Sequence, residues 1–116
     1  MSINIISLEG QLVTPFKQIQ KDNIYFGVAT YVANINKKNR FIKVLIFDAN
    51  TFLYDKAKKY LIEQNKGKRM CVTGKLSFDS LDNIQIVAND IEFVDKFIDQ
   101  NTVADNKVEF DESELP

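Results

Sequence analysis

The residues whose types and spacing best fit a defined chemistry lie between Arg40 and Asp48, where the chain reads Arg-Phe-Ile-Lys-Val-Leu-Ile-Phe-Asp. Alternate side chains of a β-strand point to opposite faces. One face of this segment would be purely apolar and consists of Ile42, Val44 and Ile46. The other face consists of Phe41, Lys43, Leu45 and Phe47. Aromatic rings on either side of a lysine suit a surface that stacks nucleic-acid bases and neutralises the phosphates between them.

The same segment also fits a strand that is buried on both faces, because such strands are apolar almost throughout. Lys43 argues against that interpretation, since a lysine in the middle of a strand is rarely buried without a partner. The alternation of this segment alone leaves both interpretations open, and the surrounding elements have to decide between them.

The residue inventory excludes several kinds of functional site. The chain has no histidine and a single cysteine, Cys71. Histidine-based metal sites, Cys–His dyads and Ser–His–Asp triads are therefore excluded. We expect no metal, no cofactor and no enzymatic activity. One cysteine cannot form an intramolecular disulfide, which fits a reducing compartment.

Length and charge indicate one small domain followed by an acidic tail. The 116 residues allow a single modest core. Residues 1–95 hold 13 of the 15 basic residues and 10 of the 16 acidic ones, whereas residues 96–116 hold two lysines and six acidic residues. The sequence has no recognisable signal peptide and no run of about 18 apolar residues, so we expect a soluble intracellular protein.

Hydrophobic periodicity and turn residues predict five strands and one helix. Strands are expected over residues 3–13, 24–33, 40–48, 68–78 and 84–93. Residues 14–23 are expected to form a polar connection, and residues 34–39 and 79–83 to form turns. The helix is expected to begin at Asn50 or Thr51, to run to about Gln64 and to stop at Gly67.

Three strands, one helix and two further strands is the order of the OB-fold, a five-stranded barrel that binds oligonucleotides on its second and third strands. Gly10 and Gly74, inside the first and fourth strands, fit the bends that a closed barrel requires. The sequence therefore predicts a mainly β protein. It would comprise an OB-fold barrel over residues 1–95, with one helix between strands three and four, and a flexible acidic C-terminal tail over residues 96–116.

Short motifs in this order resemble the bacterial-type single-stranded DNA-binding proteins (SSB). The opening strand of that family is similar to residues 5–12, which end in Gly10-Gln11-Leu12. Four further motifs are similar to its later strands and its helix end: Val28-Ala29-Thr30, Val44-Leu45-Ile46-Phe47, Lys59-Tyr60-Leu61 with Lys66-Gly67, and Val72-Thr73-Gly74-Lys75-Leu76. The resemblance covers residues 3–95 and implies an OB-fold, sequence-independent binding of single-stranded DNA, and a homo-oligomer, either a dimer or a tetramer.

Carried onto this chain, the resemblance places the stacking aromatics of the family on Phe41 and Phe47 and a phosphate contact on Lys43. A further family aromatic falls near Phe78, and Tyr31 is a nearby substitute, on the outward face, for one that has no match. Basic residues expected at the groove complete the candidate nucleic-acid-binding set: Lys17, Lys21, Lys37, Lys38, Arg40 and Lys75. The alternative for each basic residue is an ordinary solvated surface.

The chain also departs from the family pattern. It contains no Trp, on which many members stack bases, and the turns at residues 34–39 and 79–83 are short. The long linker and the terminal Phe of the family are absent as well, a compact plan that resembles small phage or plasmid members. The site size and the mode of DNA wrapping therefore stay open.

The acidic tail allows three interpretations. It could imitate nucleic acid and compete for the basic groove. It could be a disordered, solubilising end. The resemblance implies a third role, docking of replication or recombination proteins, and the candidate partner-binding residues are Phe110, Asp111, Glu112, Glu114 and Leu115.

The leading hypothesis is a non-enzymatic protein that binds and protects single-stranded DNA in replication, recombination or repair, in the bacterial cytoplasm at the nucleoid. One alternative is an OB-fold adaptor whose outward aromatics bind replication proteins of the primosome type. Another is an RNA-binding OB module, because stacking surfaces accept both kinds of strand.

Overall fold

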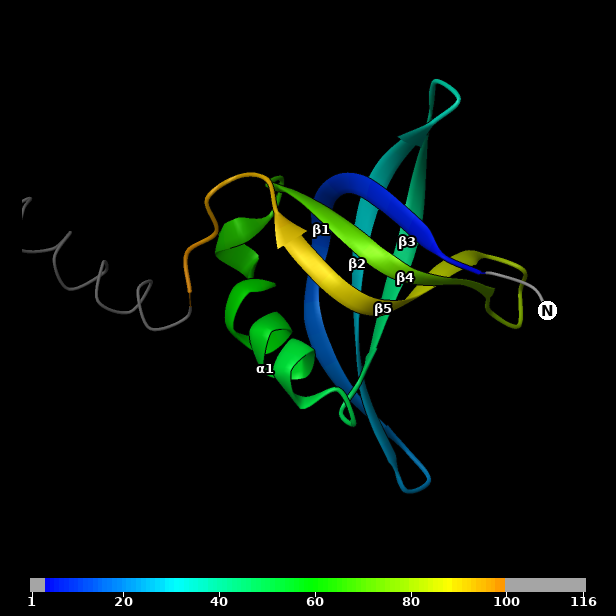
Figure 1. The fold of residues 1–116 in the computed structure, drawn as a ribbon, viewed down its shortest axis with the longest axis vertical. Helices are drawn as coiled ribbons and strands as arrows, with labels where there is room; N and C mark the ends of the chain where they lie inside the picture. The colour runs from blue at the N-terminus through cyan, green and yellow to red at the C-terminus, as the bar shows by residue number, and fades with distance from the viewer. Residues whose placement is uncertain (1–3, 100–116) are drawn as a thin grey trace, which may run out of the picture.

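The computed structural model describes residues 4–99 and shows a closed barrel of five strands in the order β1-β2-β3-β5-β4 (Figure 1). Strands β3 and β5 run parallel, and the other neighbouring pairs are antiparallel. The element bounds are β1 Ile6–Lys21, β2 Ile24–Ile35, β3 Lys38–Phe47, α1 Thr51–Tyr60, the 3-10 helix η1 Glu63–Asn65, β4 Arg69–Phe78 and β5 Ile84–Phe93. This confirms the predicted mainly β barrel with one α-helix between strands three and four, the OB-fold arrangement.

Strand β1 is longer than predicted, because it continues through residues 14–21 instead of ending in a polar connection. This second half pairs with β2, and the register shifts between Leu12 and Thr14 and again between Thr14 and Lys17. Such bulges let a strand tolerate Pro15, which cannot donate a hydrogen bond to the ladder. Lys17 and Lys21 therefore lie on a strand and not in a loop.

The hairpin of β2 and β3 is also longer than predicted. Ile35 still pairs with Lys38, which leaves Asn36 and Lys37 as the turn. Both have a positive φ, 52° and 66°, as two-residue hairpin turns require. The predicted turn of residues 34–39 thus shrinks to two residues, and the hairpin projects from the barrel at the top of Figure 1.

Helix α1 begins where the sequence predicted and ends earlier. The side-chain oxygen of Asn50 accepts a hydrogen bond from the Leu53 amide at 3.4 Å, as a helix N-cap does. The α-helix ends at Tyr60, and the chain continues through η1 to the buried Asn65. The Asn65 side-chain amide donates to the carbonyls of Tyr60 and Ile98, both at 2.7 Å, so it joins the helix end to the segment after β5.

Packing against the barrel continues past the end of β5. Phe97 is buried, and its ring stacks on that of Phe93 with centroids 4.2 Å apart. Within residues 4–99, neither α1 nor η1 has the length and apolar character that crossing a membrane would require.

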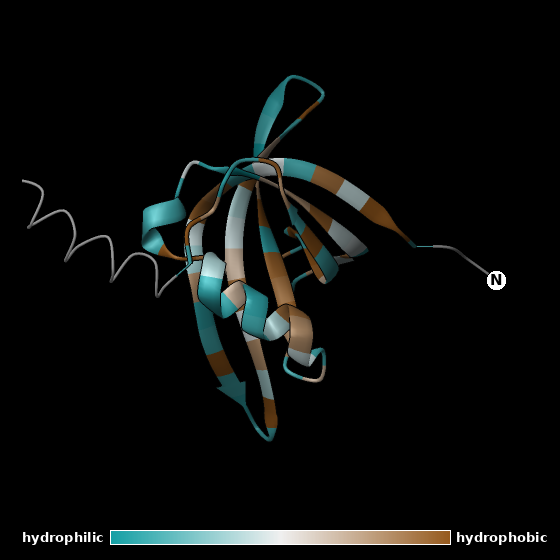
Figure 2. Ribbon diagram, turned by 60° about the vertical axis from the view of Figure 1, so that its left-hand side comes forward, coloured by the Kyte–Doolittle hydropathy of each residue, from teal (hydrophilic) through white to brown (hydrophobic). Residues whose placement is uncertain are grey.

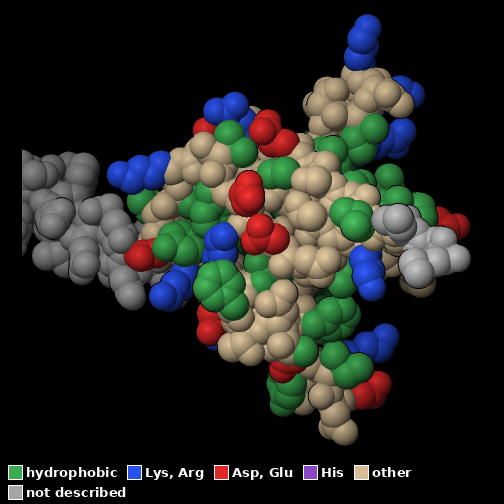
Figure 3. All heavy atoms as spheres, in the orientation of Figure 1, with side chains coloured by type: hydrophobic (Ala, Val, Ile, Leu, Met, Phe, Trp, Pro, Cys, Tyr) green, Lys and Arg blue, Asp and Glu red, His purple; other side chains and the backbone are tan. Residues whose placement is uncertain are grey.

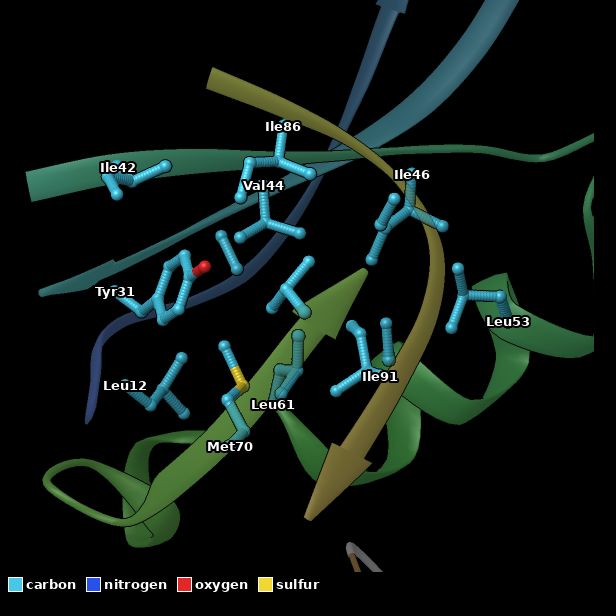
Figure 4. Packing of buried hydrophobic residues seen from close by; sticks show 14 of the residues in the cluster. Leu12, Tyr31, Ile42, Val44, Ile46, Leu53, Leu61, Met70, Ile86 and Ile91 are labelled. Carbon is cyan, nitrogen blue, oxygen red and sulfur yellow. The ribbon is translucent and has the colours of Figure 1, made fainter. Parts of the chain in front are cut away.

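The inward faces of the strands meet in one apolar core (Figure 4). Hydrophobic and hydrophilic residues alternate along the strands that enclose it (Figure 2). Tyr31 is fully buried in this core, and its hydroxyl donates to the Leu8 carbonyl at 3.1 Å. Its predicted place on the outward face was wrong. The small residues Gly27, Ala29 and Ala33 share its face of β2, and they leave room inside the barrel for the large ring.

Candidate nucleic-acid interface

Strand β3 has one face in the core and one face in solvent. Ile42, Val44 and Ile46 are completely buried, whereas Phe41 is 68% and Phe47 40% exposed. The structure therefore decides against a strand buried on both faces. Along a strand the rise is about 3.3 Å per residue, so the two rings stand about 20 Å apart. At that distance they would contact different nucleotides of a bound strand.

The outward face of β3 continues onto its neighbours. Across the antiparallel pair, Phe41 lies opposite Val32, Lys43 opposite Thr30, and Phe47 opposite Phe26. On the parallel side, Lys43 and Leu45 lie beside Gln85 and Val87 of β5. Paired residues share a face of the sheet, so one outer surface spans β2, β3 and β5.

This surface carries two open grooves. The first, about 780 Å³ in volume, lies between β3 and the turn that joins β4 to β5. It is lined by Thr30, Ile35, Asn39, Arg40, Phe41, Lys43, Phe78, Asp82, Asn83 and Ile84. Four residues of the predicted binding set, from two strands, therefore meet in this first groove: Arg40, Phe41, Lys43 and Phe78.

The second groove, about 380 Å³ in volume, lies toward the other end of β3 and is more apolar. Its lining consists of Lys21, Asp22, Ile24, Phe26, Leu45, Phe47, Ser77, Gln85 and Val87. Lys43 of the first groove and Leu45 of the second are successive outward residues of β3, so the strand passes from one groove into the other. The Phe47 ring packs against Phe26 with centroids 6.0 Å apart, which explains why Phe47 is less exposed than Phe41.

The remaining predicted basic residues are all exposed. Lys21 lines the second groove, whereas four others line neither groove: Lys17, Lys37, Lys38 and Lys75. Lys37 and Lys38 lie at the tip of the β2–β3 hairpin, where Figure 3 shows a group of basic side chains at the top of the view. Lys17 pairs with Val28, and Lys75 with Val87, so both project from the outer surface. Tyr31 lies in the core and cannot reach a ligand on this surface.

Two acidic residues of the β4–β5 turn also belong to this site, although the sequence analysis did not predict them there. Asp82 lines the first groove. Asp79 forms an ion pair with Lys43, in which the distance from Nζ to Oδ2 is 2.8 Å. The other Asp79 oxygen accepts from the backbone amides of Leu81 and Asn83 at 2.8 and 2.9 Å. The Lys43 ammonium, helped by these amides, holds the pKa of the Asp79 carboxyl well below its ordinary value.

Sequence reasoning also missed the contribution of β2 and β5 to the second groove. Phe26 and Val87 line it together with Phe47. A signal for Phe26 was present, because the residues on the opposite face of β2 include Gly27, Ala29 and Ala33. Small residues of this kind mark the crowded interior of a small barrel, so Phe26 had to face outward.

Among residues 4–99, no three His, Cys, Asp or Glu residues are placed to hold a metal ion. The candidate partner-binding residues lie outside the described part of the chain: Phe110, Asp111, Glu112, Glu114 and Leu115.

Solved structures show that this barrel is a known arrangement. No protein-family profile and no curated protein sequence matches the chain. The chain is similar to the SSB of Plasmodium falciparum in complex with single-stranded DNA, at 22% identity and a TM-score of 0.62, over 82% of this chain and 97% of that one. A mitochondrial single-stranded DNA-binding protein of Saccharomyces cerevisiae gives 12% identity and a TM-score of 0.62, over 83% and 98%.

A third similar structure is the dimeric N-terminal domain of the PriB protein from Thermoanaerobacter tencongensis. It gives 17% identity and a TM-score of 0.56, over 80% of this chain and 98% of that domain. At these identities the likeness establishes the fold. The two grooves are the observations from which a function has to be argued.

Proposed function

We propose that this chain binds single-stranded DNA without sequence preference and protects it during replication, recombination or repair. The observation that carries the proposal is the first groove, which is lined by the exposed Phe41 ring, by Arg40 and Lys43 of the same strand, and by Phe78 of β4. Rings and cations interleaved along one surface stack bases and neutralise phosphates. The similar fold of an SSB that was solved with single-stranded DNA supports the same conclusion.

In the proposed mode, the DNA strand follows β3 from the first groove into the second. Bases stack on Phe41 and Phe78 in the first groove and on Phe47 in the second, and each stack contributes about 1–3 kcal/mol. Lys43, Arg40 and the lysines of the hairpin tip contact phosphates and release counterions. No step requires a bond to break, so the proposed role is binding and not catalysis.

We also propose that the chain works as a homo-oligomer. The N-terminal PriB domain with the similar fold is dimeric. The outer surface of a barrel this small offers two short grooves, and pairing two copies would lengthen the path available to a strand.

A salt titration with fluorescein-labelled oligo(dT) tests the proposal directly. Fluorescence anisotropy should report binding that weakens linearly in a plot of log K against log salt, with about 0.7 cations released per phosphate contact. Phe41→Ala should weaken the affinity by roughly 5- to 150-fold, the equivalent of one stacked base, with little change in melting temperature.

The matched control is Phe52→Ala. Phe52 is 79% exposed on α1 and lines neither groove, so its removal should leave the affinity unchanged. Absence of oligo(dT) binding at low salt, or an affinity indifferent to salt, would refute the proposal. Competition with matched oligo(rU) separates DNA from RNA binding, and capture of a replication protein at salt that abolishes DNA binding would instead favour the adaptor.

A further inference from the structure

Lys43, the lysine at the centre of the first groove, is already paired with a carboxylate of the same chain. Its Nζ lies 2.8 Å from Oδ2 of Asp79. The lysine side chain is 47% exposed, whereas that of Asp79 is 14% exposed. The positive charge that would attract a phosphate is therefore neutralised until Asp79 is displaced.

Asp79 is held in this position without help from Lys43. Its Oδ1 accepts from the amides of Leu81 and Asn83, and its own amide donates to the Asn83 carbonyl at 3.0 Å. The Asn83 side-chain amide also donates to Oδ2 at 3.2 Å, so the turn holds both carboxylate oxygens and shares Oδ2 with the lysine. Lys43 can therefore exchange partners without unfolding the turn.

A tethered carboxylate of this kind competes with any ligand at the millimolar or higher effective concentration of an intramolecular partner. A free anion at lower concentration does not displace it. A phosphate of a strand whose bases are stacked on Phe41 and Phe78 is different, because those rings line the same groove and hold the phosphate close to Lys43. Stacking of the bases therefore favours the exchange of Lys43 from Asp79 to the phosphate.

We infer that Asp79 is an internal competitor for the phosphate position on Lys43, so that this contact forms more readily with single-stranded DNA stacked on the neighbouring rings than with a free anion. The inference rests on the proposed function and adds a role for a carboxylate in a site expected to attract anions. Asp79 lowers the affinity of the site and makes its ion-pair partner, Lys43, selective for an anchored strand.

Asp79→Asn tests this inference in the full-length chain. The amide oxygen of asparagine can still accept from the two turn amides, while its NH2 group replaces Oδ2, so Lys43 loses both the negative charge and the acceptor. We expect oligo(dT) affinity to rise by about two- to fivefold, the range that matches the worth of an exposed ion pair.

Three further variants test whether the effect of Asp79 depends on its ion pair with Lys43. Asp82→Asn removes a carboxylate that lines the same groove and makes no ion pair within residues 4–99, so it should change the affinity less. Lys43→Gln should weaken binding, and Lys43→Gln/Asp79→Asn should bind no better than Lys43→Gln. Thermal melting checks that each variant folds, and Asp79→Ser, whose hydroxyl can also accept, replaces Asp79→Asn if that variant does not.

The outcomes separate the two proposals. Unchanged or weaker binding by Asp79→Asn would overturn the inference that Asp79 competes for Lys43, since it would show that Asp79 only positions Lys43 or has no part in binding. An equal gain in the Lys43→Gln background would overturn it too, because the effect would then be general repulsion. If wild type and all variants fail to bind oligo(dT), both the proposed function and this inference are wrong.

Discussion

At the scale of single residues, the outer surface and the core use similar side chains for opposite purposes. Phe41 is an exposed ring, whereas Tyr31 is a fully buried ring whose hydroxyl donates to the Leu8 carbonyl. Burial raises the pKa of the Tyr31 phenol well above its ordinary value, with a smaller contribution from Cys71. Exposure and not residue type therefore separates the ring available for stacking from the ring that supports the barrel.

Tyr31→Phe should accordingly affect stability and not binding. The change deletes one hydrogen bond in the core and keeps the packed ring, so we expect the free energy of unfolding to fall by about 0.5–1.5 kcal/mol. Urea denaturation measures this loss, and oligo(dT) affinity of the folded variant should equal that of wild type. A loss of affinity without loss of stability would place Tyr31 in the binding surface after all.

At the scale of elements, strands β4 and β5 approach each other closely at Gly74. The β4–β5 register shifts between Thr73 and Gly74, which marks a bulge. A Cβ atom at Gly74 would lie 2.0 Å from the Val87 carbonyl oxygen, a contact with backbone that no side-chain movement relieves. The position therefore requires glycine because two strands approach closely there.

Gly74→Ala should destabilise the barrel by about 1–3 kcal/mol, the usual cost of forcing extra atoms into a packed site. Thermal or urea denaturation gives the value. Gly67→Asn is the matched control, because Gly67 has a φ of 85° with open space around its Cβ position, and asparagine tolerates that conformation. Equal stability of Gly74→Ala and wild type would show that the two strands can separate at this bulge.

At the scale of the whole molecule, two ion pairs connect segments that are distant in the sequence. Lys43 of β3 joins Asp79 of the β4–β5 turn, and Arg69 at the start of β4 joins Asp95 after β5. Hydrogen bonds from Lys43 and Arg69 lower the pKa values of Asp79 and Asp95, respectively. Each carboxyl thus binds protons less readily in the folded chain than in the unfolded one.

The sign of the resulting pH dependence follows from these depressed pKa values. The two carboxylates stabilise the fold above the ordinary Asp pKa near 4, and that contribution is lost as the pH falls below it. Melting temperatures should therefore change little from pH 7 to 5 and fall from pH 4 to 2.5. Asp79→Asn/Asp95→Asn should fall less steeply over the acid range.

A control for the acid series is Asp90→Asn, which removes a carboxylate of β5 that makes no ion pair among the described residues. Its acid profile should parallel that of wild type. A double variant that loses as much stability in acid as wild type would show that the two ion pairs contribute nothing measurable in solution.

The sequence by itself determined the order of the elements and which residues of β3 share a face. Both are local properties, because alternation with period two needs no knowledge of distant residues. Alternation also paired Tyr31 with Gly27 and Ala29 on β2, but it could not say which face turns inward. That depends on the volume inside the closed barrel, which only the complete set of strands defines.

The tertiary structure alone decided how distant residues meet in the site. Phe78 and Phe41 line the same groove, and Asp79 forms an ion pair with Lys43, which is 36 residues away in the sequence. Both contacts arise because β5 lies between β3 and β4 and brings the β4–β5 turn next to β3. The length of β1 was decided in the same way, since pairing with β2 outweighs the local preference of Pro15. The sequence thus predicted Phe41 and Lys43 as site residues, whereas the ion pair of Lys43 with Asp79 depends on the closed barrel and was found only in the tertiary structure.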